Sequence, residues 1–184
     1  HQYKNMPDAS YAAYTYQTVR GTMKTIIGTK QDVVKKLTAL VADVLARKPE
    51  ANIAVSAVDL PAEVLDALAA SDIAFDRATL FQACEYCGAA GKGAHAVGAA
   101  FSPLMAAKPF AAVHAPDPDA DAEHAADYDA AIQAAGGLDL VILGLGERGH
   151  VAFNEPGAGF GEKTHIAKLA EVTRAAIAAD FGTL

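Results

Sequence analysis

The stretch LDLVILGLGERGHVAFNEP, from Leu138 to Pro156, decides which class of fold this chain adopts. It opens with an almost unbroken apolar run whose branched residues predict a strand buried on both faces, as in a parallel sheet. Gly144, Gly146 and Gly149 follow in G-x-G-x-x-G spacing, which lets the backbone approach a ligand without Cβ atoms in the way. Because ligands of open α/β sheets bind just beyond the carboxyl ends of strands, we expect a site here.

Three interpretations compete for the residues after this strand. Dinucleotide binding would usually place the strand first and an acidic residue at the end of the next strand, but this strand comes late and the region around Glu171 has a helical pattern. The second is a sugar-phosphate site in which His150 acts as acid or base and Glu155 holds its ring. On one helix these side chains would lie about 140° apart, so they meet only if the helix breaks, which Pro156 allows. The third, a turn with a surface histidine, leaves the glycines and the nearby carboxylate unexplained.

Composition places limits on the class of protein. The 184 residues predict one domain with a substantial core, and a net charge of -7 argues against nucleic acid or acidic membranes as partners. The longest apolar stretches are too short for a membrane span, and the polar first residues do not read as a signal peptide. We therefore expect a cytoplasmic protein.

Strand and helix patterns alternate along the chain. Residues 1–21 predict an N-terminal arm, and residues 22–184 predict a single domain. Thr29 is placed to cap a helix, with Asp32 as the acid of a capping box. The alternation predicts a three-layer α/β fold with a mostly parallel sheet. The expected strands cover residues 23–27, 53–58, 78–83, 111–114 and 138–143, and the expected helices follow Thr29 and cover 61–70, 102–110, 120–135 and 168–180. The site should lie at the carboxyl ends of the strands that begin at Ile53, Ala78 and Leu138.

The run GLGERGHVAFNEPG, residues 144–157, resembles the G-x-G-x-D-G-H-I-A-F-N-E-P signature of the glucosamine-6-phosphate deaminase/isomerase family, which belongs to a superfamily with the 6-phosphogluconolactonases. Weaker likeness extends from about Thr25 to Arg174. The resemblance implies a Rossmann-like fold and the conversion of an amino-sugar phosphate to a ketose phosphate with loss of ammonia. It implies no cofactor, and it is compatible with a homo-oligomer.

The resemblance also implies catalytic roles. His150 matches the ring-opening acid/base and Glu155 its partner. Cys84 stands in place of the family's proton-shuttling aspartate, in the stretch ACEYCGA. A thiol with a pKa of about 8.5 is mostly protonated at neutral pH, so it replaces a carboxylate poorly. Glu85 can substitute only if the turn lets it swing in, and deamination by the usual route is expected to be weakened.

The substrate-binding positions implied by the resemblance are altered as well. The family's T-G-S-T-P loop corresponds to the stretch from Ser56 to Pro61, where Asp59 is expected to repel a phosphate. Arg148 replaces the signature's aspartate. A cation at this position is expected to disfavour the protonated form of the His150 imidazole or, alternatively, to bind a phosphate or carboxylate. A basic stretch at Lys163 retains some anion affinity. The residues implied to bind substrate are Ser56, Ala57, Gly144, Gly146, Arg148, Asn154 and Lys163.

Alternatives stay open beside this interpretation. Cys84 and Cys87 with His95 or His114 form a weak zinc pattern or a redox motif, but the cysteines more readily fill ordinary loop positions, so we expect no metal. A member that kept the fold and lost the chemistry would be a binding or regulatory module. A third option is hydrolysis of a sugar lactone by a water that His150 activates, which needs no base at C2.

Overall fold

The computed structural model describes residues 14–18, 21–87, 96–121, 123–146, 149–155, 157–159 and 161–175. In chain order, the elements are β1 (Tyr14–Thr18), β2 (Gly21–Thr25), α1 (Lys30–Arg47), β3 (Asn52–Val55), α2 (Ala62–Ala70), β4 (Thr79–Gln82), α3 (Ala96–Ala99), α4 (Ser102–Ala107), β5 (Ala112–His114), α5 (Ala125–Ala134) and β6 (Leu140–Ile142). A last helical turn covers residues 171–175. The predicted alternation of strands and helices is confirmed.

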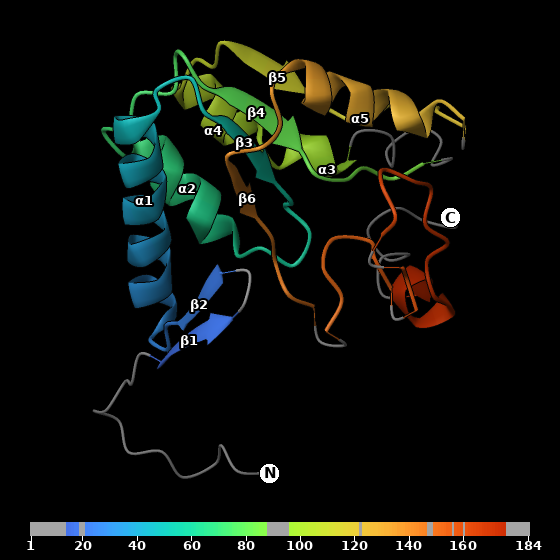
Figure 1. Ribbon diagram of the computed structural model, residues 1–184, viewed down its shortest axis with the longest axis horizontal. Helices are drawn as coiled ribbons and strands as arrows, with labels where there is room; N and C mark the ends of the chain where they lie inside the picture. The colour runs from blue at the N-terminus through green and yellow to red at the C-terminus, as the bar shows by residue number, and fades with distance from the viewer. Residues whose placement is uncertain are drawn as a thin grey trace, which may run out of the picture.

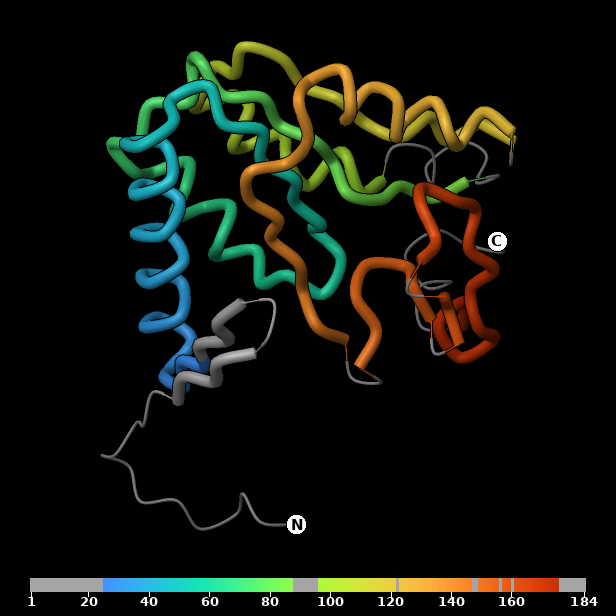
Figure 2. The backbone as a smooth tube through the Cα atoms, in the orientation of Figure 1, coloured from blue at the N-terminus to red at the C-terminus, as the bar shows by residue number. Residues whose placement is uncertain are grey.

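The main sheet is parallel, as predicted. Within the described ranges it has four strands in the order β5-β4-β3-β6, which Figure 1 shows edge to edge. Ile53 of β3 lies opposite Leu80 of β4 on one side and Leu140 of β6 on the other. Because parallel strands share one direction, their carboxyl ends lie along one edge of the sheet, and Figure 2 shows the chain leaving β3, β4 and β6 toward the same side.

Helices cover both faces of this sheet and give the predicted three layers. Val41 of α1 and Val64 of α2 pack in one buried cluster with Ile53 and Leu80. Phe81 points to the opposite face, where its ring lies 6.2 Å from that of Tyr128 on α5. Figure 1 shows α1 and α2 side by side on one side of the sheet and α5 on the other. Alternate residues of each strand therefore enter different layers of the core.

The capping box predicted before α1 is present. The hydroxyl of Thr29 accepts a hydrogen bond from the amide of Asp32 at 3.2 Å, and the carboxylate of Asp32 accepts one from the amide of Thr29 at 3.1 Å. The apolar residues of α1 are only partly buried, because Val41 and Leu45 enter the core while Val33 and Leu40 stay exposed.

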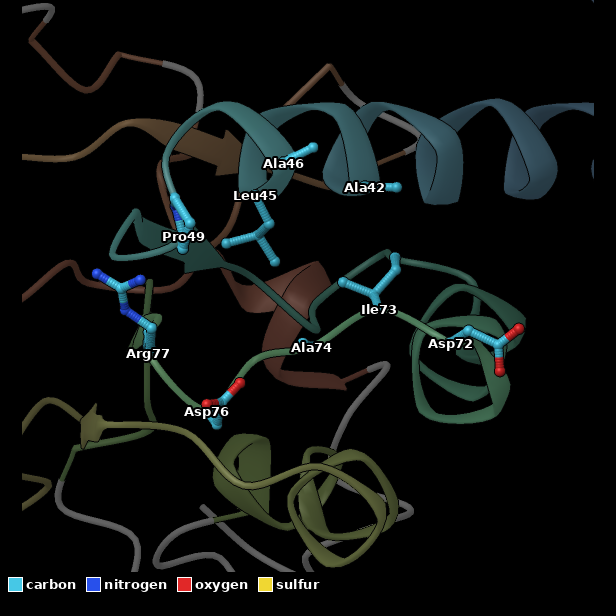
Figure 3. A pocket seen from close by; sticks show the side chains of 9 residues that line it. All are labelled: Ala42, Leu45, Ala46, Pro49, Asp72, Ile73, Ala74, Asp76 and Arg77. Atoms are coloured by element: carbon cyan, nitrogen blue, oxygen red, sulfur yellow. The ribbon is translucent and has the colours of Figure 1, made fainter.

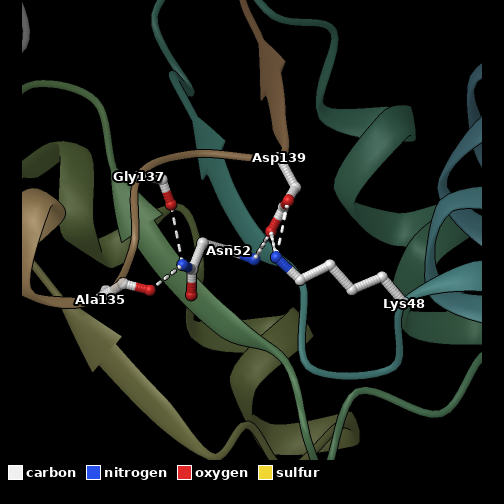
Figure 4. Close-up of polar contacts among 5 residues, drawn as sticks. All are labelled: Lys48, Asn52, Ala135, Gly137 and Asp139. Carbon is white, nitrogen blue, oxygen red and sulfur yellow. Dashed lines mark hydrogen bonds and ion pairs between the residues drawn. The ribbon is translucent and has the colours of Figure 1, made fainter.

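Side chains at the amino ends of the strands align β3 with β6 (Figure 4). The carboxylate of Asp139 accepts hydrogen bonds from the amide of Asn52 at 2.9 Å and from the ammonium of Lys48 at 2.8 Å. The side-chain amide of Asn52 donates to the carbonyl oxygens of Ala135 and Gly137. These bonds set the parallel register at the end of the sheet opposite the predicted site.

Two expectations about the strands need correction. Residues 14–18, expected to be part of an arm, form β1, which pairs antiparallel with β2 in a separate sheet, so the strand predicted over 23–27 does not join the main sheet. The strand after Leu138 is not buried on both faces: Ile142 is 4% exposed, but Val141 is 47% exposed. The reason is position, since β6 pairs only with β3 in the described sheet.

No helix in the described ranges is long and apolar enough to cross a membrane.

Candidate functional site at the carboxyl ends of β3, β4 and β6

The loop after β6 touches the loop after β3, and a glycine makes this contact possible. A Cβ atom on Gly144 would lie 2.3 Å from the carbonyl carbon of Asp59 and 2.5 Å from the carbonyl oxygen of Val58. Such distances exclude any side chain at position 144 unless one loop moves. The first glycine of the predicted series therefore brings two strand ends together, where the site was expected.

His150 folds back over the second glycine and meets a carboxylate of the other loop. A Cβ atom on Gly146 would lie 2.1 Å from the imidazole ring, so only glycine leaves room for it. The Nε2 atom of His150 lies 2.9 Å from Oδ2 of Asp59, and the two side chains are 12% and 36% exposed. The Nδ1 atom of His150 is buried and has no hydrogen-bond partner in the described part of the chain.

Asp59 holds an unusual backbone conformation. Its φ is +55°, in the left-handed region that glycine adopts most easily and that aspartate tolerates better than most residues. The sequence predicted that Asp59 would act on a ligand by repelling phosphate. In the structure its nearest recorded ionic partner is the protein's own His150.

The two residues expected to pair, His150 and Glu155, have different partners in the structure. The Glu155 carboxylate accepts hydrogen bonds from the hydroxyl of Thr173 at 2.5 Å and from the amide of Ala170 at 3.4 Å. The carboxylate on His150 is that of Asp59. The room above Gly146 directs the imidazole toward the β3 loop, while the segment before residue 171 comes close enough to engage Glu155.

Cys84 follows β4 and is buried beside Ser56. The two side chains are joined by a 3.5 Å contact between Sγ and Oγ. Burial, which is the largest cause, and the negative charges of Glu85 and Asp59 raise the pKa of the Cys84 thiol, the Ser56 hydroxyl offsets part of the effect, and the resulting pKa is about 11. At neutral pH, Cys84 is therefore a neutral thiol.

Glu85 serves the backbone of α3. Its carboxylate is buried and accepts hydrogen bonds from the amides of Tyr86 at 2.8 Å, Val97 at 3.1 Å and Gly98 at 2.9 Å. The suggestion that Glu85 replaces the missing base is therefore not supported, because three amides hold the carboxylate at the start of this helix. Sequence reasoning missed this role, since α3 is short and begins inside a glycine-rich stretch without a helical pattern.

The other predicted residues divide between the site and the surface. Ser56 is fully buried and Ala57 packs against the core, while Asn154 and Lys163 are exposed. Arg148 lies outside the described residues. Two residues that the sequence did not single out, Tyr86 and Phe153, pack with their rings tilted by 41° and the ring centroids 4.6 Å apart. This contact joins the β4 loop to the segment that carries His150.

A hollow in the described structure lies away from His150. A mostly apolar cavity of about 470 Å³ sits between the second half of α1 and the loop before β4 (Figure 3). Its lining comes from residues near the amino ends of β3 and β4, and none of them belongs to the cluster around His150. Within the described residues, no group of three histidine, cysteine, aspartate or glutamate side chains is arranged to hold a metal ion. The lining residues are Ala42, Leu45, Ala46, Pro49, Asp72, Ile73, Ala74, Asp76 and Arg77.

Comparison with known proteins finds one consistent likeness. The family model for glucosamine-6-phosphate isomerases and 6-phosphogluconolactonase matches residues 28–172. Glucosamine-6-phosphate deaminase of Pseudarthrobacter chlorophenolicus is 37% identical over 158 residues, which are 81% of this chain and 61% of that protein. The enzyme of the same name from Beutenbergia cavernae is 38% identical over 157 residues, which are 78% of this chain and 60% of that protein.

A solved structure supports the fold independently. A monomeric glucosamine-6-phosphate deaminase superposes with a TM-score of 0.68 at 24% sequence identity, covering 85% of this chain and 69% of that one. At this identity the likeness concerns the arrangement of the sheet and helices. The chain spans about three fifths of the length of the curated relatives it matches.

Proposed function

Because this chain belongs to the family of glucosamine-6-phosphate isomerases and 6-phosphogluconolactonases, we propose that it acts as an amino-sugar-phosphate isomerase/deaminase. Its substrate would be glucosamine 6-phosphate or galactosamine 6-phosphate, and its products a ketose phosphate and ammonia. The observation that carries the proposal is the position of His150, inside the matched residues and at the carboxyl ends of the strands. An imidazole there can exchange protons with a bound sugar.

Ring opening is the step for which this chain has a suitable group. The imidazole of His150 takes the proton of the C1 hydroxyl at Nδ1, the ring nitrogen that has no hydrogen-bond partner in the described residues. The C1–O5 bond breaks as the carbonyl forms, and the proton returns to O5. The carboxylate of Asp59, 2.9 Å from Nε2, stabilises the imidazolium that exists between these two transfers. Desolvation of the pair strengthens this effect, since the His150 side chain is only 12% exposed.

Transfer of the C2 proton to C1 lacks an evident base. The Cys84 thiol has a pKa of about 11 and is neutral at physiological pH, and the Glu85 carboxylate is held by three backbone amides. This observation favours a second candidate function, a member of the family that binds a sugar phosphate without turning it over.

Ammonia release separates the two candidates. We expect the chain to release ammonia from glucosamine 6-phosphate or galactosamine 6-phosphate, measured by a coupled assay, and His150→Gln to lower the rate by about 10²- to 10⁴-fold. His165→Gln is the control, because this exposed histidine contacts Glu162 away from the Asp59 pair. Binding of fructose 6-phosphate without ammonia release would support the second candidate, and turnover of a sugar lactone alone would contradict both.

Cys84→Asp tests the missing base directly. If the C2 step is slow because the thiol is neutral, a carboxylate at position 84 should raise the rate of ammonia release, whereas Cys84→Ser should leave it unchanged. Thermal melting of both variants shows whether they fold. An unchanged rate in a folded Cys84→Asp variant would contradict this account of the slow step.

A further inference from the structure

The carboxylate of Asp59 beside His150 suggests that anionic groups of a ligand are kept away from this imidazole. In the described structure the imidazole meets one charged group, the carboxylate of Asp59, at 2.9 Å from Nε2. The ring is nearly buried, so this nitrogen has little contact with water. An anionic ligand that is to use the same nitrogen has to displace Asp59.

Asp59 is placed for this contact by two features of its loop. It holds a left-handed backbone, with φ of +55°, in the loop that follows β3, and the missing side chain of Gly144 leaves room for its backbone. A non-glycine residue in this region persists only where its surroundings hold it there, and such residues concentrate at functional sites. Its carboxylate is 36% exposed, so it faces the open side of the loops as well as His150.

Two carboxylates of the described residues lie near this point. Asp59 and Glu85 both act on the buried Cys84, so two carboxylates lie near the same thiol. A carboxylate tied to the chain also has a high effective concentration next to His150, which a free anion must exceed. A dianionic phosphate that approaches Nε2 therefore meets both competition and repulsion.

We propose that Asp59 is a specificity-determining residue: its carboxylate is a built-in anion on His150 that keeps the anionic group of a ligand away from this imidazole. The consequence for catalysis rests on the function proposed above. The sugar phosphate then presents its neutral C1 hydroxyl and ring oxygen to His150, and its phosphate binds at another part of the crevice.

Asp59→Gly and Asp59→Asn test the proposal by isothermal titration calorimetry with inorganic phosphate. Both residues tolerate a left-handed backbone, so the variants should fold, which circular dichroism melting checks. We expect both to bind phosphate at least about tenfold more tightly than the original chain. Adding His150→Gln to either variant should abolish the gain, because the imidazole nitrogen that Asp59 no longer occupies is the proposed contact for phosphate.

Ala152→Gly is the matched control. Ala152 also has a left-handed backbone, with φ of +50°, but carries no charge. It should bind phosphate like the original chain, so an equal gain in Ala152→Gly would show that backbone relaxation explains the effect and would overturn the proposal. The proposal is also overturned if neither Asp59 variant gains affinity, or if the gain survives His150→Gln.

This measurement is independent of turnover. If the chain releases no ammonia but Asp59→Gly gains phosphate affinity through His150, the proposed function fails and the role of Asp59 stands. If the chain releases ammonia and the Asp59 variants gain nothing, the role of Asp59 fails and the proposed function stands.

Discussion

Single residues decide what chemistry the loops after β3, β4 and β6 can support. Gly144 leaves room for the loop after β3, and Gly146 leaves room for the imidazole of His150, where a side chain would clash in either case. Asp59 supplies the carboxylate that contacts His150. Cys84 and Glu85 stand beside this pair without a free base between them, because one is a buried thiol and the other caps α3. The proposed proton exchange therefore depends on one imidazole.

The two cysteines should differ in reactivity. Burial, the negative charges of Glu85 and Asp59 and partial compensation by Ser56 leave Cys84 with a pKa of about 11, whereas Cys87 is exposed. Since the thiolate is the reactive form, we expect a disulfide reagent at pH 7.5 to modify one thiol per folded chain quickly and the second only after unfolding. Labelling followed by mass spectrometry would identify Cys87 as the fast site. Rapid labelling of Cys84 in the folded chain would contradict the burial described here.

Strands of the main sheet are stabilised by burial of one face and by side-chain hydrogen bonds at their ends. β6 is the clearest case, because its neighbouring residues Val141 and Ile142 point to different faces of the sheet and differ strongly in exposure. Its amino end is fixed to β3 through Asp139. Each feature leads to a separate expectation about stability.

Neighbouring positions of β6 should respond differently to truncation. Ile142→Ala removes methylene and methyl groups from the core and should lower the free energy of unfolding by about 2–5 kcal/mol. Val141→Ala removes groups that are half exposed and should cost less than about 1 kcal/mol. Urea unfolding of the two variants provides the comparison. Equal losses would mean that β6 is covered on both faces.

Asp139 should make stability depend on acid pH. The ammonium of Lys48 and the amide of Asn52 lower the pKa of this carboxyl below its ordinary value of 3.8. A lowered pKa means that the stabilisation is complete above 3.8 and is lost as the pH falls through the folded value. We expect Asp139→Asn to lower the free energy of unfolding by about 1 kcal/mol at pH 7, and we expect the difference to shrink below pH 3.8.

The control for this prediction is Asp43→Asn. Asp43 pairs with Arg47 on the exposed side of α1, where solvent screens the ion pair, so little change in stability is expected. Urea midpoints at pH 7 and at low pH, measured for both variants, complete the test. A loss for Asp139→Asn that stays constant with pH would show that its charge is not the cause.

At the scale of the whole molecule, the order of the strands gives the amides of the central strand the strongest protection from hydrogen exchange. β3 pairs with strands on both sides, and its continuation is bonded as well, since the amide of Ser56 donates to the carbonyl of Ile142 and that of Ala83 to the carbonyl of Val55. The hairpin of β1 and β2 forms a separate sheet.

Hydrogen exchange should follow this order. The amides of Ser56 and Ala83 should exchange more than about a hundredfold slower than those of β1 and β2, because they open only when the main sheet unfolds. Mass spectrometry of peptides from the two regions measures the difference. Similar rates would indicate that the hairpin and the main sheet unfold as one unit.

The sequence by itself determined the class of fold, because strand and helix patterns are local. The alternation of apolar runs and turn residues, the capping box of Thr29 and the glycine series after Leu143 each depend on neighbours within a few positions. The place of the site, beyond the carboxyl ends of the strands, followed from the same patterns.

Only the tertiary structure decided which side chains meet. Asp59 reaches His150 from another loop, Glu155 engages the segment before the last helical turn, and Glu85 turns to the amides of α3. The exposure of Val141 was likewise decided by the position of β6 in the sheet. Contacts between distant residues and burial depend on how the elements pack, and a pattern along the chain contains neither.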